Sequence, residues 1–169
     1  MSADSATPAP ALPSGRFVGR EAFAQGVRDA LATAAMQGWP ELILCDASFA
    51  DWPLHERAVV ASLQDWSRAG RRCTLLAAGF DTVIRQHARF VDWRRNWGHI
   101  VEARSCRRID PPNFPTVLWS PHWTMQRLDP VRSAGVSGAE PTRIVQTREL
   151  LKDLMRVSSP AFAVTTLGL

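Results

Sequence analysis

"ELILCD" (residues 41–46) is a short apolar run between Pro40 and Asp46, and it predicts a buried β-strand. A second apolar run, "RCTLLAA" (72–78), predicts another buried strand, and "HIVEAR" (99–104) alternates apolar and polar residues as a third strand would. Helical patterns separate the three runs, so right-handed crossovers between parallel neighbours are expected. The predicted fold is therefore α/β, a three-layer sandwich with a mainly parallel sheet.

Two of the helices in this core are marked by their ends. Residues 19–38 carry apolar side chains at helical spacing until Gly38 stops the pattern. Asp51 stands before Trp52-Pro53 as a helix cap would, with proline in the first turn, and this predicts a helix that continues to Gly70.

The segment "FDTVIRQHARFVDWRRNW" (80–97) is the richest in aromatic and basic residues. Its pattern predicts one helix, with Phe90, Trp93 and Trp97 on a single stripe. We expect this stripe to pack against the sheet, because stacking on nucleic-acid bases would require exposed rings.

The rest of the chain is less regular. Residues 116–120 and 123–128 flank a Ser-Pro-His turn and predict a hairpin. Residues 129–141 are polar and contain Gly and Pro, which predicts a surface loop. The run 143–146 predicts a last short strand, and 147–157 an amphipathic C-terminal helix.

Length and composition limit the organisation and location of the protein. The 169 residues suffice for one domain, which we place at 16–169, after a disordered Ala-, Pro- and Ser-rich leader at 1–15. No apolar run approaches the roughly 20 residues that span a bilayer, and the N-terminus does not resemble a secretory signal, so no membrane partner is expected. The three cysteines form no CxxC pair, which favours the cytoplasm and argues against a metal site or other cofactor.

Charge gives a weak indication of partners. The formal net charge is +4, which favours anionic partners, but the arginines are scattered along the chain. A dedicated duplex-binding protein usually concentrates its charge on one element. Nucleic-acid binding is therefore a possible but not a favoured function.

Candidate site residues come from the ends of the predicted strands and from the helix at 80–97. Small molecules bind beyond the carboxyl ends of parallel strands, where Asp46 and Ser48 follow the first strand. Histidine and aspartate can perform acid–base chemistry, and arginine can hold an anion. The catalytic candidates are His87, His99 and Asp46. The ligand-binding candidates are Asp46, Ser48, Arg89, Arg94 and Arg107.

The segments "LILCDASFADWPL" (42–54), "RCTLLAAGFD" (72–81) and "HARFVDWRRNWGHIVEAR" (87–104) carry a family resemblance. Their layout resembles a group of proteobacterial proteins whose core is similar to one half of the phospholipase D superfamily. That superfamily uses a His-x-Lys pair, followed by an Asp, to supply a nucleophilic histidine and a phosphate-holding lysine.

The chain departs from the motif of that superfamily. His87-Ala88-Arg89 has arginine in place of lysine, Arg94 occupies the expected acidic position, and the segment is predicted to be helical. His122 is followed two positions later by Thr124. The resemblance therefore implies a degenerate half without an intact His-x-Lys motif, and we expect a protein that is not an enzyme.

Three functions follow from these observations. The first is a non-catalytic module that acts through protein contacts or assembly, as a homodimer if it behaves like the half-domains it resembles, with Trp119 and Trp123 on its surface. The second is a phosphodiesterase-type hydrolase, which needs a histidine, an acid and an arginine together at the strand ends. The third is a nucleic-acid or anionic-ligand binder, which needs one shared basic face. The arginines that would form this face are Arg94, Arg95, Arg104, Arg107 and Arg108.

Overall fold

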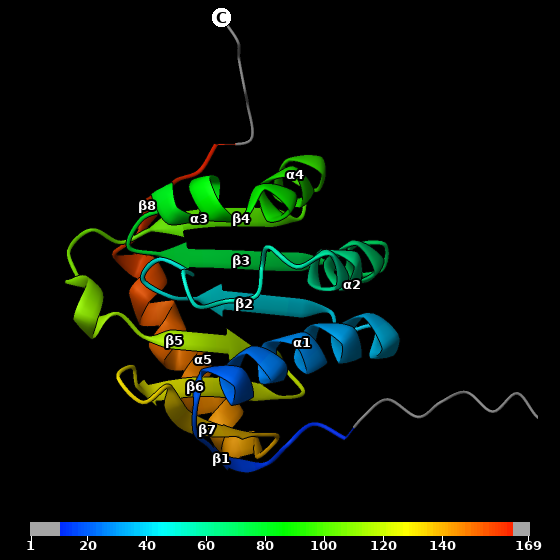
Figure 1. Cartoon of the computed structure of the whole chain (residues 1–169). Coiled ribbons are helices and arrows are strands. Elements are labelled where there is room, and N and C mark those ends of the chain that lie inside the picture. The colour runs from blue at the N-terminus through cyan, green and yellow to red at the C-terminus, as the bar shows by residue number, and fades with distance from the viewer. Residues whose placement is uncertain (1–10, 164–169) are drawn as a thin grey trace, which may run out of the picture.

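The computed structural model describes residues 11–163 as an eight-stranded mixed sheet with helices on both faces (Figure 1). The strand order across the sheet is β1-β7-β6-β5-β2-β3-β4-β8. The strands are β1 (Gly15–Phe17), β2 (Glu41–Cys45), β3 (Arg72–Ala77), β4 (Val101–Ser105), β5 (Thr116–Trp119), β6 (Thr124–Asp129), β7 (Ala134–Gly138) and β8 (Ser159–Pro160). The helices are α1 (Arg20–Gln37), α2 (Arg57–Ser67), α3 (Asp81–Gln86), α4 (Ala88–Asn96) and α5 (Pro141–Arg156), with a short 3-10 turn at Pro111–Asn113.

The prediction of a mainly parallel sheet is wrong. Only β2–β3 and β3–β4 pair in parallel, while every other pair of neighbours is antiparallel. The three predicted core strands and the hairpin of β5 and β6 do form. The difference arises after β4, because the chain returns to the other side of β2 and extends the sheet there by antiparallel β5, β6 and β7.

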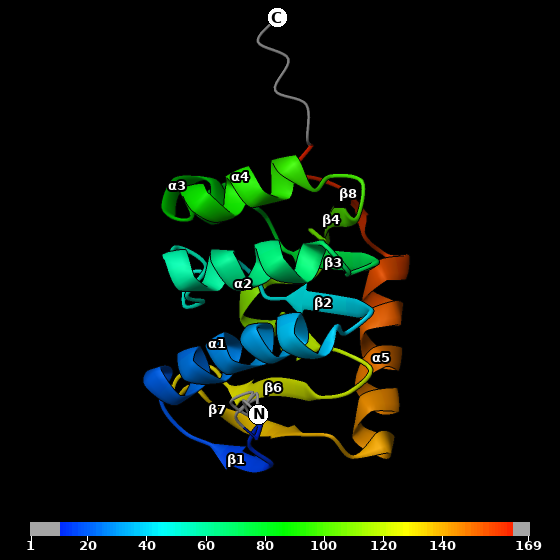
Figure 2. The ribbon, with the colours of Figure 1, turned by 90° about the vertical axis from the view of Figure 1, so that its right-hand side faces the viewer.

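The sheet separates two apolar cores. Helices α1 to α4 cover one face and α5 lies on the other, which Figure 2 shows in side view. Alternate residues of β2 serve the two sides: Leu42 and Leu44 belong to the core under α1 to α4, whereas Ile43 packs with Leu151 and Leu154 of α5. Because a strand directs successive side chains to opposite faces, a strand covered on both faces is apolar throughout, as β2 is.

The aromatic stripe of 80–97 is buried as predicted. Phe90 and Trp93 lie in the core, and Trp97 is half-buried against it. The indole N–H of Trp93 donates to the Ser67 hydroxyl at 2.9 Å. This segment therefore packs α4 onto α2 and the sheet.

Several local predictions are wrong, each for a structural reason. No helix starts at Asp51, which binds Arg127 instead, and α2 begins only at Arg57. The helix predicted at 80–97 is divided at His87, whose φ of −123° and ψ of 56° are not helical. Two further predictions are wrong. Residues 129–141, predicted as a surface loop, contain β7, and residues 143–146, predicted as a strand, belong to α5.

The start of α5 agrees with its sequence. Pro141 occupies the first turn of α5, where its missing N–H costs nothing. No helix within residues 11–163 combines the length and apolar character that crossing a bilayer requires. The domain division stays a prediction, since most of the leader, residues 1–10, lies outside the described residues.

Candidate functional site

The carboxyl ends of β2, β3 and β4 lie at the same end of the sheet, on the left in Figure 1. Strand β5 begins and β6 ends at this same end. A cleft of about 430 Å³ opens there beside β2. It is lined by the loop that follows β2, by the proline-rich segment before β5 and by the end of β6. The polar side chains that line it include Asp46, Ser48, Asp51, Thr116 and Arg127.

Asp46 is buried and accepts hydrogen bonds from several donors. Its Oδ2 accepts the backbone N–H of Ser48 at 3.2 Å and that of Phe49 at 2.7 Å. Its Oδ1 accepts a hydrogen bond from the hydroxyl of Thr116. Such bonds to a carboxylate are strong, so Asp46 holds the loop after β2 against the start of β5.

Arg127, like Thr116, is a residue of this site that the sequence does not indicate. Its guanidinium lies 3.7 Å from Asp46 and 3.1 Å from Asp51, and it sits over the ring of Phe23 at 4.8 Å. Its side chain is only 7% exposed. Two carboxylates for one guanidinium leave a formal excess of negative charge, so the cluster does not provide a site for a phosphate. The only sequence signal was a lone arginine in a predicted hairpin, and that signal does not reveal cross-sheet partners.

His87 is buried beneath the same loop. Its Nε2–H donates to the carbonyl of Phe49 at 2.8 Å, and its ring stacks on that of His55 with centroids 5.7 Å apart. Because a carbonyl can only accept, this hydrogen bond fixes the Nε2–H tautomer. Burial lowers the pKa of His87 below its ordinary value, the bond to Phe49 partly opposes this, and the neighbouring His55 lowers it further.

Asp46 and His87 therefore converge on one backbone unit rather than on a substrate. Asp46 binds the N–H of Phe49 and His87 binds its carbonyl oxygen. Phe49 has a φ of 61°, in the left-handed region that a bulky side chain disfavours. Such a conformation costs roughly 1–3 kcal/mol and persists only where the surroundings enforce it, which is what these two side chains do.

Three other predicted site residues, Ser48, Arg89 and His99, do not come together. Ser48 lies in the cleft, and its hydroxyl accepts the N–H of Ala50 at 3.3 Å. Arg89 is exposed and donates to the carbonyl of His55 at 3.0 Å. His99 is exposed beside Trp97, at the opposite end of the sheet from the cleft.

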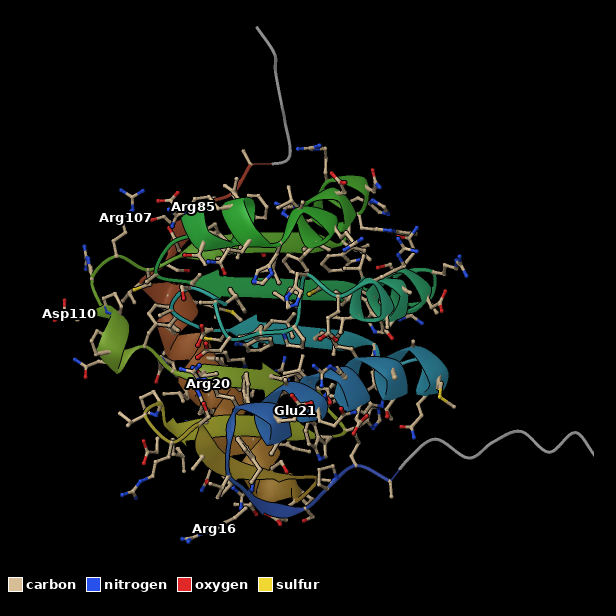
Figure 3. The ribbon with its side chains drawn as sticks, viewed as in Figure 1. Arg16, Arg20, Glu21, Arg85, Arg107 and Asp110 are labelled. Atoms are coloured by element: carbon tan, nitrogen blue, oxygen red, sulfur yellow. The ribbon has the colours of Figure 1, made fainter. Side chains whose placement is uncertain are left out.

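Arg94 and Arg107 lie at opposite ends of β4. Arg94 is buried and donates to the carbonyls of Val101 at 2.8 Å and Phe162 at 3.2 Å. Burial lowers its pKa, although Cys73 nearby opposes this. Arg107 is exposed at the carboxyl edge, on the same side as Arg85 in Figure 3. It lines a second cavity of about 560 Å³ beside the ends of β3 and β4.

The arginines named for a nucleic-acid interface do not share one face. Arg94 is buried, Arg95 pairs with Asp92 at 3.6 Å, and Arg104 pairs with Glu102 at 2.9 Å. Arg107 and Arg108 project at the far end of β4. Of the described residues, no three His, Cys, Asp or Glu side chains are grouped so that they could hold a metal ion.

The comparisons with known proteins give the fold alone. No protein-family model and no curated protein sequence matches the chain. The structure is similar to that of TrmBL2, an archaeal chromatin protein described as binding DNA, with a TM-score of 0.66 and 11% identity over 93% of this chain. It is also similar to phosphatidylserine synthase from Haemophilus influenzae, with a TM-score of 0.56 and 12% identity over 91% of this chain. The chain spans 57% and 40% of the lengths of those two structures.

Proposed function

We propose that this chain is a non-catalytic α/β module with a phospholipase D-like fold that acts through protein contacts, including contacts with a second copy. The observation that supports the non-catalytic part is the engagement of Asp46 and His87. Both hold the backbone of Phe49. The other ring nitrogen of His87, Nδ1, has no partner among the described residues but is buried, which keeps it from a phosphodiester in the cleft. A covalent phosphohistidine mechanism needs a nucleophile with an acidic partner and a cation on the phosphate.

The surface for protein contacts is not the one expected from the sequence. Trp119 and Trp123 are buried, so they offer no exposed indole face. Val18 and Leu128 instead stand exposed in a shallow hollow of about 420 Å³ beside the edge strand β1. An apolar surface next to an unpaired strand edge is a common place for another chain to bind.

The non-catalytic part is tested by the rate at which the full chain hydrolyses bis(p-nitrophenyl) phosphate. We expect the same rate as in the buffer blank for the wild type and for the Asp46→Asn and His87→Gln variants. A wild-type rate above the blank that falls in both variants would favour the hydrolase instead.

The contact surface is tested by sedimentation velocity over a range of concentrations. Leu128→Asp places a charge in the hollow and should reduce association. The matched control is Val145→Asp, which is similarly exposed but lies on α5. Equal association of the wild type and Leu128→Asp would exclude this hollow as the contact.

A further inference from the structure

The last described segment of the chain occupies the edge of β4. After α5 ends, Val157 and Ser158 lead into the two-residue strand β8, which pairs antiparallel with β4. The N–H of Ala161 then donates to the carbonyl of Ala103 at 3.0 Å. In Figure 2 this segment runs from the end of α5 up to the edge of β4. We call residues 158–162, Ser-Ser-Pro-Ala-Phe, the tail.

Side chains of the domain bind both ends of the tail. At its start, Arg104 donates from Nε to the Ser158 hydroxyl at 2.7 Å and from a terminal nitrogen to the Ser158 carbonyl at 2.9 Å. At its end, Phe162 stacks on Phe80 with ring centroids 5.2 Å apart and an interplanar angle of 21°. Arg94 donates to the Phe162 carbonyl and lies 5.7 Å from the centre of its ring.

The groups that hold the tail are more deeply buried than the tail itself. Phe80 and Arg94 are 6% and 5% exposed, whereas Phe162 and Ala161 are half-buried and Pro160 is exposed. In the part of the chain that the structure describes, Arg94 bonds only to backbone carbonyls, and its Nε has no partner. A buried guanidinium is costly unless its donors are satisfied, so losing the tail carbonyl would be unfavourable.

The tail does not fill the space in which it lies. The cavity of about 560 Å³ at the ends of β3 and β4 has Ala161 and Phe162 on one wall and Phe80, Ile84 and Arg107 among its other lining residues. Phe162 also has a φ of 50°, in the left-handed region that non-glycine residues rarely adopt. A short strand, a strained residue at the end of the tail and adjacent empty space are typical of a segment that can be displaced.

We propose that the β4 edge, Phe80, Arg94 and Arg104 form a socket for an extended Ser-x-Pro-x-Phe segment, and that the tail of a second copy can replace the chain's own tail there. The binding mode is strand addition, in which the backbone pairs with a sheet edge and an aromatic side chain enters a pocket. The second copy is the source because its tail carries the required segment, and the hinge between α5 and β8 is only Val157 and Ser158. Short hinges favour exchange of terminal elements between copies. This contact rests on the proposed function and adds a second site for the same partner, at the side of the sheet opposite the hollow beside β1.

The socket is tested with a fluorescent peptide of residues 157–163 and the full-length chain. In the wild type the attached tail competes at an effective concentration in the millimolar range, so the peptide should bind weakly. In a full-length Phe162→Ala variant the competitor is weakened, and we expect roughly tenfold tighter peptide binding by fluorescence anisotropy. A peptide with alanine in place of Phe162 should lose the binding. Equal, weak binding of both peptides to Phe162→Ala would overturn the socket.

Two further measurements locate the site and test the exchange. Arg104→Gln in the Phe162→Ala chain should weaken peptide binding, whereas Arg108→Gln, at an exposed residue just beyond β4, should not. If both variants bind equally, the peptide is held elsewhere and the proposal fails. In sedimentation, wild-type association should fall when excess peptide is added and in Phe162→Ala. Association unaffected by either would overturn exchange between copies.

The outcomes also separate this contact from the proposed function. Phosphodiester hydrolysis by the full chain would refute the non-catalytic function and leave the peptide titration unaffected. Failure of the peptide to bind would remove the tail contact while the roles of Asp46 and His87 remained as described.

Discussion

Replacing Trp93 with alanine should remove a large part of the stability of this domain. The indole is 1% exposed and packs against Phe90 with ring centroids 5.2 Å apart. Truncating a buried tryptophan to alanine costs about 3–5 kcal/mol, which includes the cavity left behind. The lost hydrogen bond to Ser67 adds no unpaired donor, because the Ser67 hydroxyl still bonds to the carbonyl of Leu63 at 2.7 Å. The estimate therefore stays within that range.

The assay is urea unfolding followed by far-UV circular dichroism, since seven tryptophans complicate fluorescence. In a thermal melt of the same variant, the loss in stability corresponds at this chain length to a fall in Tm of about 6–20 °C. Trp97→Ala is the control on the same segment, because Trp97 is only half-buried and its loss should cost less than half as much. A Trp93→Ala chain that loses less than about 1 kcal/mol would refute the packing described for α4.

Three further predictions follow from the site and the sheet. Asp46→Asn should lower the free energy of unfolding by about 1–3 kcal/mol in urea titrations, because an amide has one acceptor oxygen where the carboxylate has two for the loop N–H groups and Thr116. Asp51→Asn, at the exposed end of the cluster, should cost less, and the reverse order would contradict the role of Asp46. Gly135→Ala should destabilise the domain by about 1–3 kcal/mol, since its methyl group would overlap the backbone of β6. In the control, Gly26→Ala, the methyl group meets only the movable end of a methionine. Equal melting temperatures of the two variants would be inconsistent with the register between β6 and β7. The free energy of unfolding should also fall as the pH is lowered from 7.5 to 5.5, because His87 takes up a proton near pH 6.5 in the unfolded chain but has a lowered pKa in the folded chain. The fall should be smaller in His87→Gln. The same pH dependence of unfolding in both chains would exclude a contribution from His87.

The sequence predicts elements whose signals are local. The strands at 41–46 and 72–78 are apolar runs between residues that stop them, and both form. Strand β7 escaped prediction because Gly135 weakens strand propensity, although only glycine fits there against the backbone of β6. The break at His87 has no local signal, because the hydrogen bond that its ring makes is to Phe49, a residue 38 positions away.

The candidate site was predictable only in part. Asp46 was identified from its place at the end of a strand, and it does lie in the cleft. Its partners Thr116 and Arg127 come from antiparallel strands whose position beside β2 no local pattern encodes. For the same reason the sequence placed Asp51 at a helix cap, when its carboxylate instead binds Arg127 across the fold.

The proposed non-catalytic function requires that His87 holds the loop backbone and does not act on a substrate. The most direct measurement is the ¹⁵N NMR spectrum of the His87 ring in the full-length chain, recorded across pH with and without dimethyl phosphate. We predict the Nε2–H tautomer, a pKa below the ordinary histidine value, and no change when the phosphodiester is added. A ring that titrates at or above about 6.5 and shifts with dimethyl phosphate would contradict the account.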